Sequence, residues 1–512
     1  MPTGGASVYG RLIPLSWSRW PWLVVLIVGL LSSVPVQAID WSFFLQRGQI
    51  VLALPDVHSE GWQVTGARAD VVHSLEANHR NLIVHFKSGS RLYAERIAQD
   101  SAAAVQLNQV QVDLGGVTLS LNFSGTGSLA ERSTVTGKVG IHVAELQHPQ
   151  FKSQGWEFAG AVKGSLADLN LDGQLRSHSG LVLDAIIRSV VGEFLAAHIA
   201  ITLTGENVQE VMPATLANWP EMLEFSGGKI QAEAKLRIEP DTPLALDSQF
   251  GFESVDGLMN STAVTELNGQ LWVSLENNVL TARVSDLSIG KINSGIGIGP
   301  VSFLADYRAS QSGLLAGELN IQQATAEFLG GRLRIAPRTI DLSEQPWGLP
   351  IDAYDVSLAE LLQVYPAEGV SGSGKLTARI PVSLGVAGLA VVQGQIEAAV
   401  PGGILRLPSE RLQAMLGSRH EVEPVVKALQ NFQYSVLKST VDYDNEGRLA
   451  LGLRLEGKEA GAENGQPIVV NLNIEEDIPA LLTSLQLSGR VNEAVTERVR
   501  QRLQQTEQEA MP

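Results

Sequence analysis

The sequence predicts a mainly β protein: an elongated, curled antiparallel β-sheet groove built of repeated modules, with a few short helices and an N-terminal membrane anchor. Three observations favour this fold class. Apolar and polar residues alternate along most of the chain, turn-forming dipeptides separate the alternating stretches, and similar segments recur at a regular spacing. The 512 residues include 50 glycines, about 10% against a usual level of about 7%, which suits many tight turns between strands.

The first 38 residues have the layout of an export segment. Arg19 and an earlier arginine precede the apolar run WPWLVVLIVGLLSSVPVQA, and acidic residues begin only after it. The basic end should therefore stay in the cytoplasm while the rest is exported. A short apolar core followed by small residues favours a signal peptide cleaved after Ala38. Counted over residues 20–36, the run approaches the roughly 17-residue minimum for a membrane span and could remain as an anchor. Both interpretations stay open.

Strands follow from strict alternation. The stretches GVTLSLNFSG (116–125) and GRLALGLRLEG (447–457) each place apolar side chains on one face and polar ones on the other. Glycine-rich punctuators such as KSGSR, FSGTGS and DNEGR separate such stretches, and they favour hairpins over the long crossovers of a parallel sheet. We therefore expect antiparallel neighbours along the chain.

The chain also repeats itself. MLEFSGGKIQAEAKLRI and EGVSGSGKLTARIPV each follow a helical-looking stretch, and their lysines, Lys229 and Lys375, stand 146 positions apart. A second pair, LGGRLRIAP and PGGILRLP, is offset by about half that distance, 72 positions. A repeat of this kind predicts modules that add sheet to sheet along one axis.

The glycines before Lys375 superficially match a phosphate-binding loop. Leu376 stands where such a loop needs Ser or Thr for a magnesium ion, a helical pattern precedes it where a strand is required, and an alternating stretch follows where a helix is required. We interpret residues 372–375 as a helix-to-strand turn.

Helical spacing returns near the end of the chain. SERLQAMLGSRHEVEPVVKALQNF begins at a plausible N-cap, Ser409, and RVNEAVTERVRQRLQQTEQEA closes the sequence. The predicted division is a signal-anchor or signal peptide at 1–38, N-terminal β-groove modules at 39–265, a C-terminal β-groove region at 266–488, and a helix and tail at 489–512.

Composition and motifs argue against catalysis and nucleic-acid binding. The net charge of −17 would repel a phosphate backbone, and zero cysteines exclude thiol chemistry. The nine histidines are scattered without acidic companions at ligand spacing, and G-x-S-x-G does not occur. We expect no catalytic residue, no metal and no cofactor, and an enzyme is the weaker class.

The one-sided strands need something to cover their apolar faces. The sequence offers few helices for this, so a curled sheet whose inner face holds acyl chains is one solution, and an ordinary closed β core is the other. Aliphatic dominance with 6% aromatic residues suits a lining that is indifferent to ligand detail.

A family resemblance adds to this pattern. The region from about residue 269 to 487, with LTARVSDLSIGKINSGIGIGPVSFLADY and above all NLNIEEDIPALLTSL (471–485), resembles the C-terminal part of YdbH-type proteins, which belong with the AsmA-like bridge proteins of Gram-negative envelopes. The resemblance implies an inner-membrane anchor, a periplasmic β-groove with an apolar interior, and phospholipid movement towards the outer membrane. Some members carry a dicarboxylate-transport label, for which this sequence has no basic carboxylate-binding cluster.

From these observations we expect a carrier that shields phospholipid acyl chains between the inner and outer membranes, located at the inner membrane with a periplasmic bulk, or in the periplasm after signal cleavage. The alternative is a scaffolding envelope protein that binds no lipid. Some 25 to 30 strands at roughly 4.8 Å would stack to on the order of 120–145 Å, which we expect to need a small outer-membrane lipoprotein as a partner.

The sites follow from alternation. The expected partner edge is Val470, Leu472 and Ile474, guarded by the helix after residue 489, and Lys235, Arg237, Arg379 and Arg454 should point outward. The expected lipid lining consists of Ile230, Leu236, Leu333, Ile335, Leu376, Ile380, Leu449, Leu451, Leu453 and Leu455.

Overall fold

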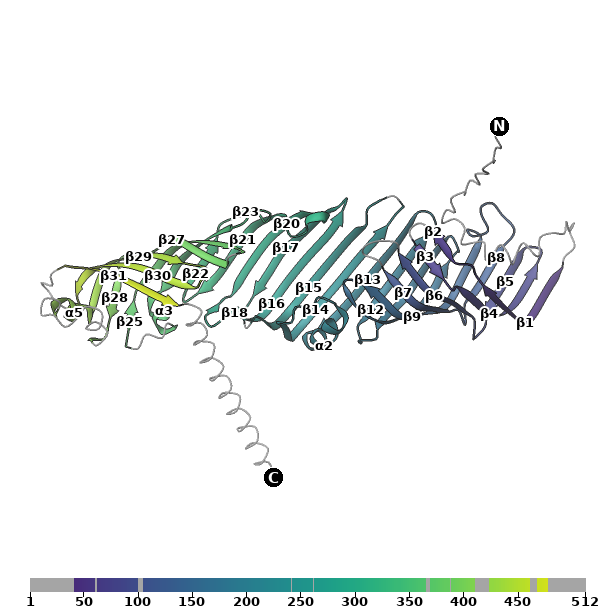
Figure 1. Ribbon diagram of the computed structural model, residues 1–512, viewed down its shortest axis with the longest axis horizontal. Helices are drawn as coiled ribbons and strands as arrows, with labels where there is room; N and C mark the ends of the chain where they lie inside the picture. The colour runs from purple at the N-terminus through teal and green to yellow at the C-terminus, as the bar shows by residue number, and fades with distance from the viewer. Residues whose placement is uncertain are drawn as a thin grey trace, which may run out of the picture. The chain divides into compact units, whose positions relative to one another are not determined.

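The fold is antiparallel β throughout the part of the chain that the computed structural model describes (Figure 1). That part comprises residues 41–59, 62–99, 105–240, 242–260, 262–364, 369–386, 388–409, 423–460 and 467–477. It contains 31 strands and three short α-helices. The predicted fold class of a mainly antiparallel β protein with few short helices is confirmed. The predicted N-terminal segment at 1–38 and the predicted helix at 489–512 lie outside the described residues.

The chain divides into two compact units. Unit 1 comprises residues 1–220 and 231–248, and unit 2 comprises residues 221–230 and 249–512. Two strands contribute residues to both units, β14 (Leu223–Ile238) and β15 (Ala245–Met259). The boundary expected between residues 265 and 266 stays a prediction.

Unit 1 is a series of antiparallel strands, each paired with its neighbours, with one fork at which a single strand pairs with two others along the same edge. β4 pairs with β1, and on its other edge it pairs with β5 in one half and with β6 in the other. The branches β5–β8 and β6–β7 rejoin on β9, which continues through β10, β11 and β12 to β13. The strands are β1 (Ser42–Ala53), β2 (Val57–Ser59), β3 (Trp62–Thr65), β4 (Arg68–Asn78), β5 (Asn81–Phe86), β6 (Arg91–Gln99), β7 (Gln106–Asp113), β8 (Thr118–Asn122), β9 (Ser133–His148), β10 (Phe151–Gly164), β11 (Asp168–Ser177), β12 (Val182–Val190) and β13 (Phe194–Thr204).

The fork explains where one hairpin prediction is wrong. KSGSR joins β5 to β6, which both pair with β4 and not with each other. Ser90, fully buried in this turn, fills the fork: its hydroxyl donates to the Val72 carbonyl at 2.6 Å and accepts from the Val72 amide at 3.1 Å. FSGTGS and DNEGR do join paired strands, β8 with β9 and β29 (Phe432–Tyr443) with β30 (Arg448–Glu459).

The core of unit 1 lies on one face of these strands. A cluster around Leu82, Leu121 and Phe158, all at most 4% exposed, packs across β5, β8 and β10. A second cluster includes Val211 of α2 (Gly205–Thr215), the helix expected before the first repeat. Thr204 caps this helix, since its side chain accepts from the Asn207 amide at 3.3 Å.

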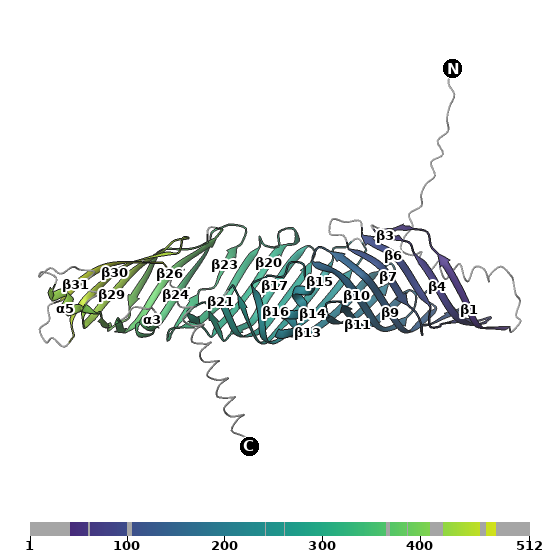
Figure 2. The same cartoon turned by 60° about the horizontal axis from the view of Figure 1, so that its bottom comes forward.

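Unit 2 continues the same construction. β16 pairs with β17 and β18, and β17 with β20, which pairs with β21. β21 then forks, because its first half pairs with β23 and its second half with β22. From β22 the pairing runs through β24, β26, β27, β29 and β30 to β31, and Figure 2 shows β29 and β30 side by side. The remaining elements are β16 (Thr262–Glu276), β17 (Val279–Ile289), β18 (Lys291–Asn293), β19 (Gly297–Ile298), β20 (Val301–Ser310), β21 (Glu318–Phe328), β22 (Gly331–Ile335), β23 (Arg338–Asp341), β24 (Trp347–Ser357), α3 (Leu358–Val364), β25 (Ser371–Ser373), β26 (Lys375–Gly385), β27 (Gly388–Ala398), β28 (Gly403–Arg406), α5 (Glu423–Leu429) and β31 (Ile468–Asp477), with a 3-10 turn at Gln311–Gly313.

The glycine-glycine repeat marks two equivalent short strands. β22 and β28 follow Gly330 and Gly402, and both glycines have positive φ angles, 68° and 96°, that favour glycine. Each short strand pairs with only half of a longer strand, β22 with the second half of β21 and β28 with the first half of β29. The repeated sequence thus places a branch strand at each position.

Candidate functional site

An apolar face runs across unit 2. In an antiparallel sheet, directly paired residues point to the same side. Leu451 on β30 pairs with Val441 on β29 and with Ile474 on β31. Arg454 on the same strand pairs with Lys438 and Asn471, so the other side is polar.

The same separation holds at the other end of unit 2. Val284, Ala305 and Ile321 pair in sequence across β17, β20 and β21. On the opposite face of these strands, Arg283 donates from Nε to the Asp306 carboxylate at 2.8 Å. We call the side that carries Leu451, Val284 and Ile321 the unit-2 apolar face.

Much of this face is only half-buried. Along β17, Leu280, Val284 and Leu287 keep part of their surface exposed, while the intervening Thr281 and Arg283 are exposed. Helices α3 and α5 contact β24, β25 and β30, so they leave the aliphatic side chains of β17 partly open. Side chains in this condition can accept further apolar contact.

The predicted lining residues, taken together with the predicted partner edge on β31, divide into two groups. Most of them are half-buried and alternate with exposed polar residues, as the sequence pattern predicts. The half-buried set consists of Ile230 and Leu236 on β14, Leu333 and Ile335 on β22, Ile380 on β26, Leu449, Leu451 and Leu453 on β30, and Leu472 and Ile474 on β31.

Three predicted residues lie instead in a closed core. Leu376 is 5% exposed, Leu455 is 0% and Val470 is 7%. They pack in one cluster with Phe432 and Tyr434, to which α3 and α5 also contribute. These three side chains have almost no exposed surface to offer a ligand, so the proposed lining rests on the half-buried set.

The cluster is completed by a tyrosine that the sequence reasoning missed. Tyr434 is 1% exposed, and its hydroxyl donates to the Ser373 carbonyl at 2.7 Å. Burial raises the pKa of this phenol, which keeps it neutral and able to donate. The signal in the sequence was the paired aromatic residues in NFQYSV, next to the helical stretch that ends in α5.

The residues expected to point outward do so. Lys235, Arg237, Arg379 and Arg454 are all exposed. Arg379 lies 3.2 Å from the Asp352 carboxylate, an exposed ion pair of the kind that contributes about 0–1 kcal/mol.

The glycine-rich stretch before Lys375 is not built like a phosphate-binding loop. α3 precedes it, the short β25 covers Ser371–Ser373, and β26 begins at Lys375. The Lys375 ammonium donates to the Gly330 carbonyl at 3.3 Å. A helix-to-strand connection is present where a strand-to-helix loop would be needed. The turn expected at residues 372–375 is wrong in detail, because residues 371–373 form a short strand that pairs with β28.

The last described strand has one paired edge. β31 pairs with β30 along ten residues, from Ile468 to Asp477, and no second partner strand is found among the described residues. Asn471 and Asn473 are exposed on its polar face.

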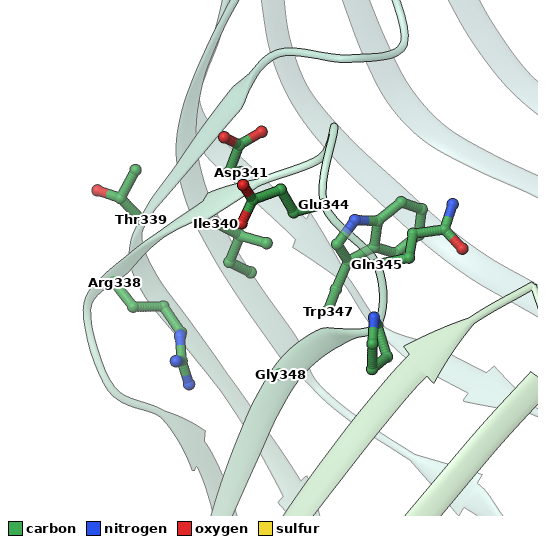
Figure 3. Close-up of a pocket in the computed structure, with 9 residues that line it drawn as sticks. Arg338, Thr339, Ile340, Asp341, Glu344, Gln345, Trp347 and Gly348 are labelled. Carbon is green, nitrogen blue, oxygen red and sulfur yellow. The ribbon is translucent and has the colours of Figure 1, made fainter.

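A polar hollow of about 270 Å³ opens at the connection between β23 and β24. Figure 3 shows Arg338 to Asp341 along one side and Trp347 and Gly348 on the other. The carboxylate of Asp341 accepts from the Ser343 hydroxyl at 2.6 Å and the Ser343 amide at 2.8 Å, and these bonds hold the pKa of Asp341 below its usual value.

The described residues hold no group of three or more His, Asp or Glu side chains arranged to bind a metal ion. None of their helices is long and apolar enough to cross a membrane.

Comparison with known families decides the relationship. The sequence model of one family, YdbH-like, described as "Intermembrane phospholipid transport protein YdbH", matches residues 12–500. The chain belongs to the YdbH-like family. The match extends over both units, beyond the C-terminal region in which the sequence stretches carry the resemblance, and the family's described role is phospholipid transport between membranes. No curated protein and no solved structure matches the chain.

Proposed function

We propose that the chain is a periplasmic bridge-like carrier that shields phospholipid acyl chains in an apolar β-groove between the inner and outer membranes. The observation that carries this proposal is the unit-2 apolar face, which is largely aliphatic and runs across successive paired strands. Ala305, Ile321 and Val441 on this face are buried, whereas Val284, Leu333 and Leu451 are only half-buried. The chain's membership of a phospholipid transport family indicates which class of ligand would cover this face.

The energetics favour acyl chains as the cover. Each methylene removed from water contributes about 0.8 kcal/mol, and the gain is non-directional. Aliphatic side chains such as Val284 and Leu451 offer contact without fixing a ligand by hydrogen bonds, so a chain can move along the face. We propose no catalytic step, because the proposed role requires only binding and release.

The N-terminal end of unit 1 supports a membrane-proximal position. Trp41, Phe43 and Phe44 are 41%, 54% and 61% exposed on or beside β1. They follow the apolar run of residues 20–36 by a few residues, and aromatic side chains favour the membrane–water interface. We propose that the inner membrane holds this end and that the bulk of the chain is periplasmic.

The opposite end of the sequence offers a partner site. We propose that a small outer-membrane lipoprotein adds strands at β31, where Val470, Leu472 and Ile474 occupy one face and the second backbone edge is available for strand addition. Photocrosslinkers at Asn471 and Asn473 should trap this partner, whereas a probe at Asn122 in unit 1 should not. Silence at both C-terminal positions would contradict the partner proposal.

Native mass spectrometry of the full chain tests the carrier proposal. The protein would be released from membranes, transferred out of detergent and analysed for bound lipid. A carrier should retain stoichiometric phospholipid. A chain that is folded and free of lipid would support the scaffolding alternative instead.

A further inference from the structure

An opening lies beside the fork at β21. β23 and the first residues of β24 lie next to this opening. β23 is hydrogen-bonded to β21 on the edge away from the opening, and the first residues of β24 are hydrogen-bonded to β26 on the edge away from it. The hollow of about 270 Å³ lies between these two strands.

Two side chains of the hollow face the unit-2 apolar face. Arg338 pairs directly with Ile321, and Trp347 pairs with Leu384, so both share the side of the aliphatic residues. Both are half-buried. A guanidinium on an otherwise aliphatic face is costly unless an anion pairs with it.

One donor of each side chain has no acceptor among the described residues. The Nε of Arg338 and the Nε1 of Trp347 are buried and unpartnered. The nearby carboxylates do not serve: Asp341 is held by Ser343, and Figure 3 shows the guanidinium of Arg338 pointing away from Asp341 and Glu344. Two buried donors on opposite sides of one hollow therefore await an acceptor.

We propose that this hollow is a headgroup subsite, in which Arg338 and Trp347 donate to the phosphodiester and ester oxygens of a phospholipid whose acyl chains lie on the unit-2 apolar face. This inference rests on the proposed carrier function. Guanidinium–phosphate hydrogen bonds are strong and directional. The carboxylates of Asp341 and Glu344 at the rim disfavour multiply charged anions, so a singly charged phosphodiester fits better than free phosphate or a nucleotide.

The test compares Arg338→Gln with Arg334→Gln in the full chain. Arg334 is an exposed arginine on the polar face of the neighbouring strand β22, so its substitution removes the same charge outside the hollow. Each protein would be loaded from a mixture of phosphatidylglycerol, phosphatidylethanolamine and diacylglycerol with matched acyl chains, and the bound lipids would be quantified by mass spectrometry.

We expect Arg338→Gln to lower the ratio of bound phospholipid to diacylglycerol about tenfold, because a hydrogen bond to a charged group is lost, while Arg334→Gln leaves the ratio unchanged. Trp347→Phe should give a smaller fall in the same ratio. Thermal unfolding of each variant checks that the fold is retained.

Two failures can be told apart. If the unsubstituted chain binds lipid and Arg338→Gln keeps its phospholipid preference, the headgroup subsite is wrong and the carrier function stands. If the unsubstituted chain binds neither phospholipid nor diacylglycerol, the proposed function itself fails, and the subsite with it.

Discussion

Replacement of Leu451 by aspartate separates the role of the apolar face in binding from its role in folding. Leu451 lies in the middle of β30, half-buried, between Val441 and Ile474 on the neighbouring strands. A carboxylate there keeps access to water when the face is bare and loses that access when an acyl chain covers it. The substitution should therefore weaken lipid binding more than it weakens folding.

The magnitudes follow from burial. Full burial of a leucine side chain contributes about 1.5–3 kcal/mol, so loss of the half-buried Leu451 should lower the free energy of unfolding by about 1 kcal/mol. Covering an unpaired carboxylate with an acyl chain costs several kcal/mol. Since each 1.4 kcal/mol is a factor of ten, lipid affinity should fall by about a hundredfold or more.

The assay measures lipid retained per chain together with the free energy of unfolding in urea. Asn473→Asp is the matched control, because Asn473 is exposed on the polar face of β31 and the substitution adds the same single negative charge. The control should retain lipid as the unsubstituted protein does. A folded Leu451→Asp protein with normal lipid content would refute the one-sided binding face.

Three further predictions concern folding and the excluded nucleotide site. Leu455→Ala, at a position that is 0% exposed, should lower the free energy of unfolding in urea by about 2–5 kcal/mol; a loss below about 1 kcal/mol would contradict the closed core. Lys375→Ala should leave lipid retention nearly intact, and equilibrium dialysis should detect no ATP binding to either protein; nucleotide affinity that disappears with Lys375 would restore the phosphate-loop interpretation. Hydrogen bonds from Arg448 hold the pKa of Asp444 below its usual value, so the turn between β29 and β30 should be stabilised above the unfolded-state pKa, about 3.9, and lose this stabilisation as pH falls through the lower folded-state pKa. Hydrogen exchange in the turn should show this acid dependence, and Asp444→Asn should abolish it.

Local sequence patterns were sufficient to predict the fold class and, for most strands, which face is apolar. The alternation in GRLALGLRLEG predicts one apolar and one polar side of β30, and the structure places Leu451 and Arg454 on opposite sides. The helical spacing before each repeat predicts α2 and α3. These features depend on neighbours within a few residues, which a sequence displays directly.

Which strands pair, and how deeply a side chain is buried, depend on residues that are distant in the sequence. KSGSR has the composition of a hairpin turn, but β5 and β6 both find their partner in β4. Leu449 and Leu455 look alike in sequence, yet Leu455 alone is enclosed by Phe432 and the helices. Alternation predicts which face a side chain occupies and leaves open what covers that face.

The orientation of Arg338 shows how one break in alternation hides the proposed subsite from sequence reasoning. In β22, Leu333 and Ile335 face the apolar side, and continued alternation would put residue 337 on that side and Arg338 on the polar one. The connection at residues 336 and 337 shifts this phase by one residue, and β23 pairs Arg338 with Ile321. A one-residue change of phase reverses every side chain that follows it.

Site-specific photocrosslinking in cells that express the full chain shows whether phospholipid lies on the unit-2 apolar face. A photoreactive residue would replace Leu349 or Leu451 on the apolar face, and Arg334 or Asn473 on the polar face, with adducts identified by mass spectrometry. We expect phospholipid adducts at the first two positions and none at the other two. Equal labelling of both faces, or no lipid adduct on the apolar face, would contradict this expectation.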